Sequence, residues 1–552
     1  MEETTLAPDG ATPRSARAAT IAEAFRLTVA DRPDRVAVRT KDDEVSLTWS
    51  QLRDRVDAFA GGLASLGVAR GDTVALMIGN RPEFHLADLA AMTLGAVPFS
   101  VYATSSAEQI VHVVGDAQAR VAVIEATFAE RLSEARAQLP ALEHVIVLEG
   151  AHGEGTIAWD DVENADPGFD AEAAWRAVEP GDLITLIYTS GTTGPSKGVQ
   201  LTHGNIAAAV RCTAQMISFP EGARVISWLP SAHIAEREAH HYLPIAFGMT
   251  ITSCPDPRQI AAYLQAVRPS WFFAVPRIFE KLKAGMEGTI ADPAHPDAER
   301  NRAWLAAATQ KVELEQAGAP VPDALAATVA EADAQLFAGL RALLGLDQAE
   351  AVNVGAAPTP REVIVFFHAI GIPLAELWGM SETCGAGCCN PREKIKIGTV
   401  GPAAPGVELK LAASESGDEG AARGRGELLM RSAVVTPGYR GLPERTAEAL
   451  DADGWLHTGD IAEIDEDGYV RIVDRMKELI INAAGKNMSP AYIEAALKGS
   501  SPLLGQACVI GDGRRYNTAL LVLDADVAPA WAQRQGIEGR SLEQLASEPA
   551  VQ

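Results

Sequence analysis

The chain has 552 residues, 47% of them hydrophobic, so it is too long for one ordinary core and we expect at least two domains. Its formal net charge of -26 argues against nucleic acid as a partner, because nucleic-acid phosphates are bound by a clustered positive surface. A nucleotide can still bind, since one local loop with a cation is enough.

The ends and the apolar stretches of the chain give no sign of export or membrane insertion. The first ten residues, MEETTLAPDG, are acidic and lack the apolar stretch of a secretory signal. The best candidate for a membrane span, residues 363–380, is interrupted by His368, Gly371, Pro373 and Glu376, which favours a buried helix and strand. We therefore expect a cytoplasmic protein, with peripheral membrane contact left open.

The six cysteines do not have the spacing of a disulfide framework. Cys384, Cys388 and Cys389 are close in sequence, but no histidine or further cysteine stands at ligand spacing around them. We expect them to be small core residues rather than metal ligands.

In chain order, the hydrophobic periodicity predicts helices over 48–69 and 82–95 around an apolar strand at 73–78. Such alternation is typical of parallel sheets covered by helices. The segment 284–350 is rich in Ala, Glu and Asp and predicts inserted helices with a solvated charged face.

Residues 188–198, YTSGTTGPSKG, follow the apolar run 183–187 and suit a polyphosphate. Glycines let backbone N–H groups approach phosphate closely, hydroxyls add rotatable donors, and a lysine adds a mobile positive charge. The glycines are Gly191, Gly194 and Gly198, the hydroxyls Ser190, Thr192 and Thr193, and the lysine Lys197. Ser196 and Gly198 around this lysine exclude a Walker A loop. A Gly/Ser/Thr-rich surface turn is the alternative, favoured only for a shorter string such as SGTTG.

Further motifs follow in order: GAAP at 355–358, ELWGMSETCG at 376–385, GELLMRS and PGYRG across 426–441, GWLHTGD at 454–460 and RIVDRMKELIINAAGKNMSP at 471–490. Together with the loop, they resemble the adenylate-forming superfamily of acyl-CoA synthetases, luciferases and peptide synthetase adenylation domains, over about residues 20–525. The strings LPSAHIAERE at 229–238 and NAAGKNMSP at 482–490 are most similar to the long-chain fatty acyl-CoA synthetase branch.

The resemblance implies an α/β fold. Its large N-terminal adenylating domain, residues 1–476, has helix-covered, mostly parallel sheets and a smaller β-barrel-like part. A small mobile α+β lid follows at 477–552. The implied reaction joins ATP to a fatty acid with Mg²⁺, releases pyrophosphate, and passes the acyl group to coenzyme A.

The resemblance also implies the site residues. Catalytic roles fall to Thr189, Lys197, His233, Glu382 and Thr383, with Glu382 as the magnesium ligand. Ser190, Gly191, Thr192, Thr193 and Gly194 would hold phosphate; Gly355, Ala356, Ala357, Pro358, Trp378 and Gly379 would line the adenine. Asp460 and Arg475 would bind ribose or phosphate, Gly485 would border the pantetheine path, and Lys477 would be the hinge.

Several alternatives stay open at this stage. His233 could be a hydrogen-bonded structural residue, and apolar residues such as Tyr242, Trp271 and Phe272 could be core rather than an acyl tunnel. Relatives carry a C-terminal lysine that contacts the reacting groups, whereas the last lysine here is Lys498. We therefore expect an incomplete lid and weakened adenylation.

Other activities fit the same motifs. An acyl-AMP ligase that delivers to a carrier protein and a non-catalytic nucleotide- or acyl-binding protein are the rivals; no residue favours a luciferase-type oxygenase. Acyl chain length and oligomeric state do not follow from the sequence.

Overall fold

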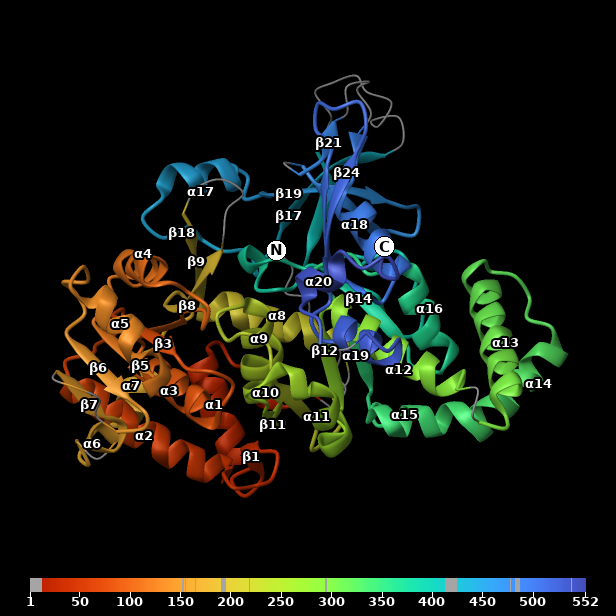
Figure 1. The fold of residues 1–552 in the computed structure, drawn as a ribbon. Helices are drawn as coiled ribbons and strands as arrows, with labels where there is room; N and C mark the ends of the chain where they lie inside the picture. Colours follow the sequence, from red (N-terminus) through yellow and green to blue (C-terminus); the bar gives the residue numbers. More distant parts are fainter. Residues whose placement is uncertain are drawn as a thin grey trace.

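A computed structural model describes residues 12–150, 153, 155–163, 165–189, 195–217, 219–292, 295–412, 424–476, 478–481, 487–537 and 539–552. Its architecture is α/β, as predicted, with a large N-terminal part and a smaller C-terminal part (Figure 1). Seven of the predicted site residues lie outside the described residues: Ser190, Gly191, Thr192, Thr193, Gly194, Lys477 and Gly485.

The first layer is a five-stranded parallel sheet in the order β4-β3-β5-β6-β7. The strands are β3 (Thr73–Met77), β4 (Val97–Ser100), β5 (Val121–Ile124), β6 (His144–Val147) and β7 (Thr156–Ala158). Every residue of β3 is buried, as an apolar run without alternation predicts. The helices expected on either side of β3 are confirmed as α2 (Trp49–Ser65) and α3 (Pro82–Thr93), which pack against each other.

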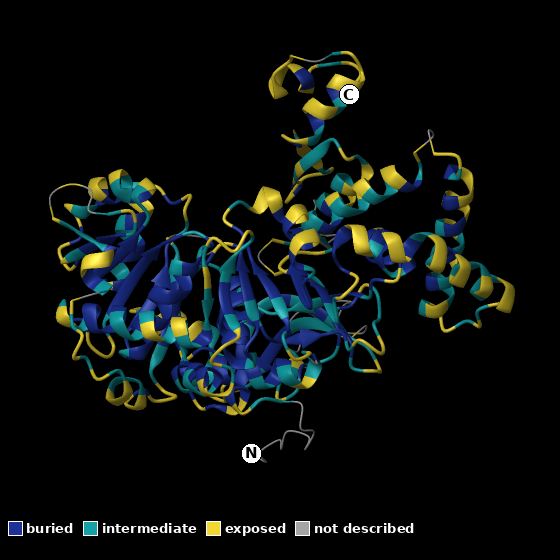
Figure 2. Ribbon diagram, turned by 90° about the horizontal axis from the view of Figure 1, so that it is seen from below, coloured by how far each residue is buried: buried dark blue, intermediate teal, exposed yellow. Residues whose placement is uncertain are grey.

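Two further sheets are mostly parallel. One has the order β10-β11-β1-β2, from β1 (Val36–Thr40), β2 (Ser46–Thr48), β10 (Arg224–Ser227) and β11 (Thr250–Ser253). The other has the order β12-β13-β14-β15, from β12 (Trp271–Ala274), β13 (Ala351–Val354), β14 (Leu374–Trp378) and β15 (Cys388–Cys389). Figure 2 shows a largely buried interior of strands, surrounded by helices whose outer faces are exposed.

Antiparallel strands supply the rest of the large part. Strands β8 (Leu183–Thr189), β9 (Lys197–Thr202) and β18 (Gly438–Tyr439) form one sheet. Strands β16 (Glu408–Leu411), β17 (Arg425–Arg431), β19 (Leu456–Ile464) and β20 (Val470–Arg475) form a four-stranded sheet where the resemblance implied a smaller β-barrel-like part.

The helices that cover these sheets are α1 (Ile21–Asp31), α4 (Ala107–Ala117), α5 (Ala129–Arg136), α6 (Trp159–Glu163), α7 (Ala171–Arg176), α8 (His203–Met216), α9 (Ile234–Arg237), α10 (Leu243–Phe247), α11 (Ile260–Val267) and α17 (Pro443–Ala449). Helix α8 begins at a capping box, because Thr202 accepts from the Asn205 N–H while the Asn205 side chain accepts from Thr202.

The helical insertion predicted from composition comprises α12 (Pro276–Ile290), α13 (Ala298–Gln316), α14 (Asp323–Ala332) and α15 (Ala338–Leu344), and Figure 1 shows α13 and α14 projecting from the body. Residues 363–380 form most of α16 (Arg361–Ala369) followed by β14, the predicted helix and strand. Among the described residues, no helix is long and apolar enough to cross a membrane.

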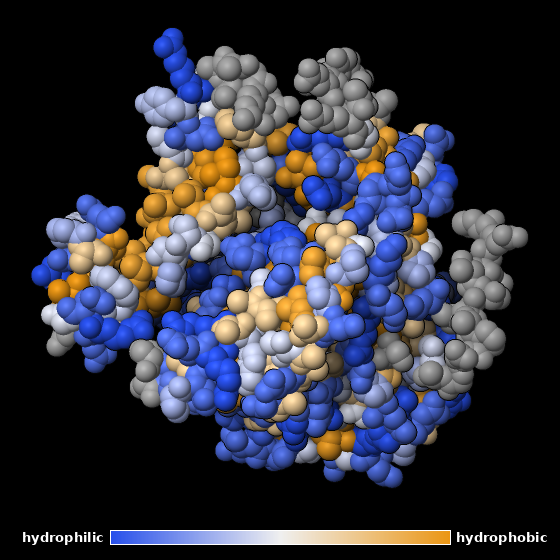
Figure 3. Space-filling view, turned by 90° about the vertical axis from the view of Figure 1, so that its right-hand side faces the viewer, coloured by the Kyte–Doolittle hydropathy of each residue, from blue (hydrophilic) through white to orange (hydrophobic). Residues whose placement is uncertain are grey.

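The C-terminal part contains β21 (Ile480–Ile481), β22 (Asn487–Met488), α18 (Pro490–Ser500), β23 (Leu504–Ile510), β24 (Thr518–Leu523), α19 (Val527–Arg534) and α20 (Leu542–Ala546). It contacts α12 through the ion pairs Arg277–Asp524 and Lys281–Asp526. Strand β24 leaves Leu520, Leu521 and Val522 exposed, and apolar side chains gather on this side of the molecule (Figure 3).

Candidate active site

A cavity of about 820 Å³ opens where the β8–β9 hairpin, the α9 segment, the turn after β14 and the antiparallel sheet meet. Seven of the predicted site residues line it: Thr189, Lys197, His233, Ala356, Gly379, Glu382 and Arg475. They come from six different elements or loops, so the cavity exists only in the folded chain.

The β8–β9 hairpin brings the lysine of the glycine-rich loop to the cavity. Thr189 pairs with Lys197 across the hairpin, so the ends of the loop between them are fixed in register. The Lys197 ammonium stands 4.0 Å from the centroid of the Tyr439 ring, on β18. A side chain at Gly198 would crowd Tyr188, since a Cβ there would lie 3.1 Å from the Tyr188 ring.

Glu382 lies in a 3₁₀ turn, η6 (Ser381–Thr383), directly after β14. The Tyr439 hydroxyl donates to Glu382 Oε1 at 2.8 Å, and the Thr436 N–H donates to the Glu382 carbonyl at 2.8 Å. Burial and the neighbouring Glu382 charge raise the pKa of Tyr439, so its phenol remains a proton donor at neutral pH. One carboxylate oxygen is thus held while Glu382 still borders the cavity.

Thr383, predicted to lie beside the α-phosphate, is held by the backbone of its own turn. It is fully buried, its hydroxyl accepts from the Met380 N–H at 3.0 Å and donates to the Met380 carbonyl at 3.2 Å, and it does not line the cavity. The hydroxyl closes the turn because a short polar side chain readily bonds nearby backbone. In this arrangement Thr383 shapes the turn that presents Glu382.

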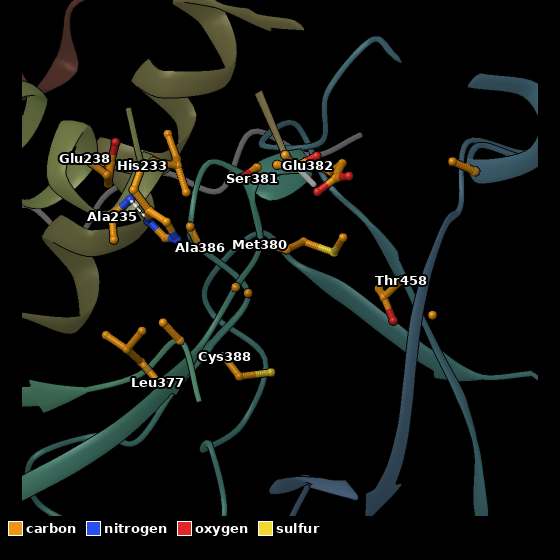
Figure 4. A pocket seen from close by; sticks show the side chains of 18 of the residues that line it. His233, Ala235, Glu238, Leu377, Met380, Ser381, Glu382, Ala386, Cys388 and Thr458 are labelled. Atoms are coloured by element: carbon orange, nitrogen blue, oxygen red, sulfur yellow. Dashed lines mark hydrogen bonds between the residues drawn. The ribbon is translucent and has the colours of Figure 1, made fainter. Parts of the chain in front are cut away.

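His233 is the N-cap of α9, and its Nδ1 accepts from the Ala235 N–H at 3.1 Å. An accepting Nδ1 leaves the proton of the neutral ring on Nε2. Burial lowers the pKa of His233, which favours this neutral form. Figure 4 shows His233 and Ala235 on the opposite side of the pocket from Glu382 and Thr458.

The residues predicted to bind ribose are already joined to one another. Trp378 Nε1 donates to Asp460 Oδ2 at 2.8 Å, and Arg475 Nε pairs with Asp460 Oδ1 at 2.8 Å. Burial raises the pKa of Asp460, although Arg475 opposes the shift. Arg475 lines the cavity, whereas Asp460 and Trp378 stand behind it.

The predicted adenine segment follows β13. Gly355 is buried, whereas Ala356, Ala357 and Pro358 are exposed, and only Ala356 lines the cavity. Ala356 has a φ of 67°, a backbone conformation that costs a residue with a Cβ some strain. Across the cavity a Cβ at Gly379 would lie 2.1 Å from the Gly385 carbonyl oxygen, so this position requires glycine.

Sequence reasoning did not single out Tyr439, Glu238 or Glu427, which also line the cavity. The PGYRG string contained a signal for Tyr439, but its pairing with Glu382 spans 57 positions and is visible only in three dimensions. Of the aromatic residues proposed for an acyl tunnel, Trp271 lines the cavity, whereas Tyr242 and Phe272 are buried core outside it.

The donor set suits Mg²⁺. No group of three or more His, Cys, Asp or Glu side chains that could hold a metal occurs among the described residues. Magnesium is commonly held by one or two carboxylates plus substrate phosphates and water, and Glu382 offers such a carboxylate at the cavity.

Relatives share this architecture. The chain is 47% identical over 401 residues to fadD11 of Mycobacterium tuberculosis, a fatty-acid–CoA ligase by name; the match covers 72% of this chain and 68% of that protein. It is 34% identical over 534 residues to the long-chain-fatty-acid–CoA ligase FadD15 of the same organism, covering 94% of this chain and 84% of that protein.

Solved structures agree in fold. A Mycobacterium tuberculosis fatty acyl CoA synthetase superposes with a TM-score of 0.65 at 24% identity, covering 96% of this chain and 91% of that one. The anthranilate CoA ligase AuaEII, in complex with anthranoyl-AMP, gives 0.72 at 20% identity, covering 94% and 89%. Residues 25–440 match the AMP-binding enzyme family and residues 477–541 its C-terminal domain. The chain therefore belongs to the AMP-binding enzyme family.

Proposed function

We propose that the protein is a long-chain fatty-acid–CoA ligase. A fatty-acid carboxylate oxygen attacks the α-phosphorus of ATP and pyrophosphate leaves; the thiol sulfur of coenzyme A then attacks the acyl carbon, and AMP leaves. The observation that carries the proposal is that Lys197, Glu382 and Arg475 line the same cavity as His233 and an apolar wall.

The first step brings an anionic carboxylate to an anionic phosphate, so positive charge must be placed where negative charge develops. Lys197 and Arg475 supply cationic side chains at the cavity. Tyr439 holds Glu382 in place, and Mg²⁺ bound by Glu382 would supply further neutralisation of the phosphates. A neutral His233 adds no charge on the acyl side of the cavity.

The apolar wall supports an extended acyl chain. Met216, Ile217, Leu243, Trp271, Phe273 and Leu377 line this side of the cavity. Met216, Ile217 and Cys389 also line a second cavity of about 720 Å³. These shared wall residues support a path along which a long chain extends beyond the first cavity.

We assign residues 1–476 to the adenylating domain and 477–552 to the lid. Rotation of the lid about Lys477 would exclude water during adenylation and then admit the thiol. Thr189, Lys197, His233 and Glu382 stay the proposed catalytic residues; Thr383 acts through the turn that it closes.

The test is pyrophosphate release from ATP and Mg²⁺ with saturated fatty acids from short to long, with and without coenzyme A. Acid-dependent release followed by acyl-CoA formation is expected, with the highest kcat/KM for long chains. Release without thiol consumption would instead favour a carrier-protein acceptor. Binding of ATP without any release would contradict the proposal.

The proposed preference for long acyl chains is tested by a substitution in the cavity wall. Met216→Trp places a large ring in the wall between the two cavities, so activity on long acids should fall while activity on short acids persists. The matched control is Leu343→Trp, because Leu343 is exposed on α15 and far from both linings. An unchanged chain-length profile in Met216→Trp would contradict the path.

A further inference from the structure

One carboxyl group in the cavity wall has no role in the reaction proposed above. Glu238 begins the π-helical stretch η3 (Glu238–Tyr242) after α9, and Figure 4 shows it on the His233 side of the pocket. Its side chain is buried, and neither carboxyl oxygen has a hydrogen-bond partner among the described residues. Short π-helical stretches within helices are frequent at functional sites.

Within the described part of the chain, no cationic side chain interacts electrostatically with Glu238. Its electrostatic neighbours there are the buried thiols of Cys212 and Cys384, whose pKa values are raised by burial and further by Glu238. The Cys384 thiol donates to the Val434 carbonyl at 3.3 Å and so is engaged elsewhere. Burial raises the pKa of Glu238 well above its ordinary value.

The neighbouring Glu236 shows what a structural buried carboxylate looks like in this fold. Its Oε1 accepts from Ser227 at 2.6 Å and from Asn80 at 3.1 Å, and its Oε2 accepts from the Leu229 N–H at 2.9 Å. His240 Nδ1 lies 2.7 Å from the same Oε2. Glu236 is therefore saturated by the protein, whereas Glu238, two residues along, is not.

At the position of Glu238, unlike along the apolar residues of the wall, a plain hydrocarbon chain is a poor match. Such a chain would displace solvent from the carboxyl group and give it no hydrogen bond, and a buried polar group without a partner is costly. A substituent that donates a hydrogen bond would satisfy the carboxyl at the moment the cavity fills.

We propose that Glu238 selects carboxylic acids whose acyl group carries a hydrogen-bond-donating substituent, a hydroxyl or an ammonium group. The inference rests on the proposed function, because it places the acyl group against this wall. It names Glu238 as a specificity-determining residue and substituted acids as the preferred substrate class.

The experiment compares kcat/KM for decanoate, for its derivatives with a hydroxyl at the second, third or terminal carbon, and for the derivatives with an amino group at the same carbons. In the wild type at least one substituted acid should exceed decanoate by about tenfold or more. Glu238→Gln keeps a neutral hydrogen-bonding group, so it should retain a hydroxyl preference and lose an ammonium preference. Glu238→Leu should lose both and favour decanoate.

Thr213→Val is the matched control, since Thr213 is another polar residue of the same cavity and its removal should leave the preference ratio unchanged. Wild-type preference for decanoate, or a ratio that Glu238→Leu leaves unchanged, would overturn the inference. The same acids are compared by their thermal stabilisation of the ATP-bound protein. Selective binding of a substituted acid without pyrophosphate release would contradict the proposed function and leave the role of Glu238 supported.

Discussion

At the scale of single residues, the site depends on how a few polar side chains are held. Glu382 is fixed by Tyr439, whose ring also faces the Lys197 ammonium, so one aromatic residue connects the carboxylate with the cation of the glycine-rich loop. Asp460 is similarly enclosed by Trp378 and Arg475. These contacts orient charged groups before any ligand arrives, which favours electrostatic stabilisation of a transition state.

Glu382→Gln should reduce acid-dependent pyrophosphate release by about a hundredfold, because a neutral amide is a poor ligand for Mg²⁺.

Tyr439→Phe should cause a smaller loss of pyrophosphate release, about tenfold, since it removes one hydrogen bond and leaves the carboxylate. Steady-state kinetics measure both changes, and circular dichroism checks that each variant is folded. Full activity of folded Glu382→Gln would refute its assignment.

At the scale of elements, β14 and the turn after it hold the site together. The strand pairs in parallel with β13 and antiparallel with β15, and the chain turns sharply at Gly379, where no side chain fits. The same strand carries Glu376, whose pKa burial raises to about 7. This short stretch therefore combines a sharp backbone turn at Gly379 with a carboxyl group, Glu376, whose ionisation destabilises the folded protein as pH rises.

Glu376 gives a pH-dependence of stability with a defined sign. An unfolded glutamate ionises near pH ~4.3. The folded group ionises near about 7, so between these values the folded protein binds more protons and is progressively destabilised as pH rises. The stabilising contribution of Glu376 to the free energy of unfolding is fully present below pH ~4.3. It is lost as pH rises through about 7.

Glu376→Gln removes this titration. The thermal midpoint of the variant minus that of the wild type should therefore increase between about pH 5 and about pH 8. Calorimetry or thermal unfolding across this range measures the difference. The control is Glu362→Gln, at an exposed position of the nearby helix α16. A difference from the wild type that does not change with pH would show that Glu376 does not titrate in this way.

At the scale of the whole molecule, two ion pairs join the described C-terminal part to helix α12. Arg277 and Lys281 on α12 pair with Asp524 and Asp526, which lie between β24 and α19 (Figure 1). Burial opposes ionisation of Asp524, but the Val527 and Asp526 N–H groups and Arg277 outweigh it and lower its pKa. The Lys281–Asp526 pair is exposed and is therefore weak and screened by salt, whereas Asp524 is buried.

Changing both Arg277 and Lys281 to Gln should loosen this docking by roughly five- to thirtyfold in population, because it removes two ion pairs that contribute up to about 1 kcal/mol each. Limited proteolysis of the C-terminal part at low and high salt measures the change, and the wild type should approach the variant as salt rises. Arg176→Gln, which breaks the exposed Arg176–Glu172 pair on helix α7, is the control. Equal proteolysis of all three proteins would show that these pairs do not hold the C-terminal part.

The fold class, the family and the segments that line the cavity are predictable from the amino-acid sequence. Apolar periodicity placed α2, β3 and α3, and composition placed the inserted helices, because both signals are local. The glycine-rich loop and the later motifs marked Lys197, Glu382 and Arg475, since each motif keeps its chemistry in adjacent residues.

Only the tertiary structure decided which polar groups are satisfied. The Thr383 hydroxyl closes its own turn, Tyr439 meets Glu382 from 57 positions away, and Glu238 finds no described partner although Glu236 finds several. The physical reason is that hydrogen bonding and burial depend on which distant segments pack together. Periodicity and motif spacing describe single segments, whereas the identity of a partner is a property of the assembled fold.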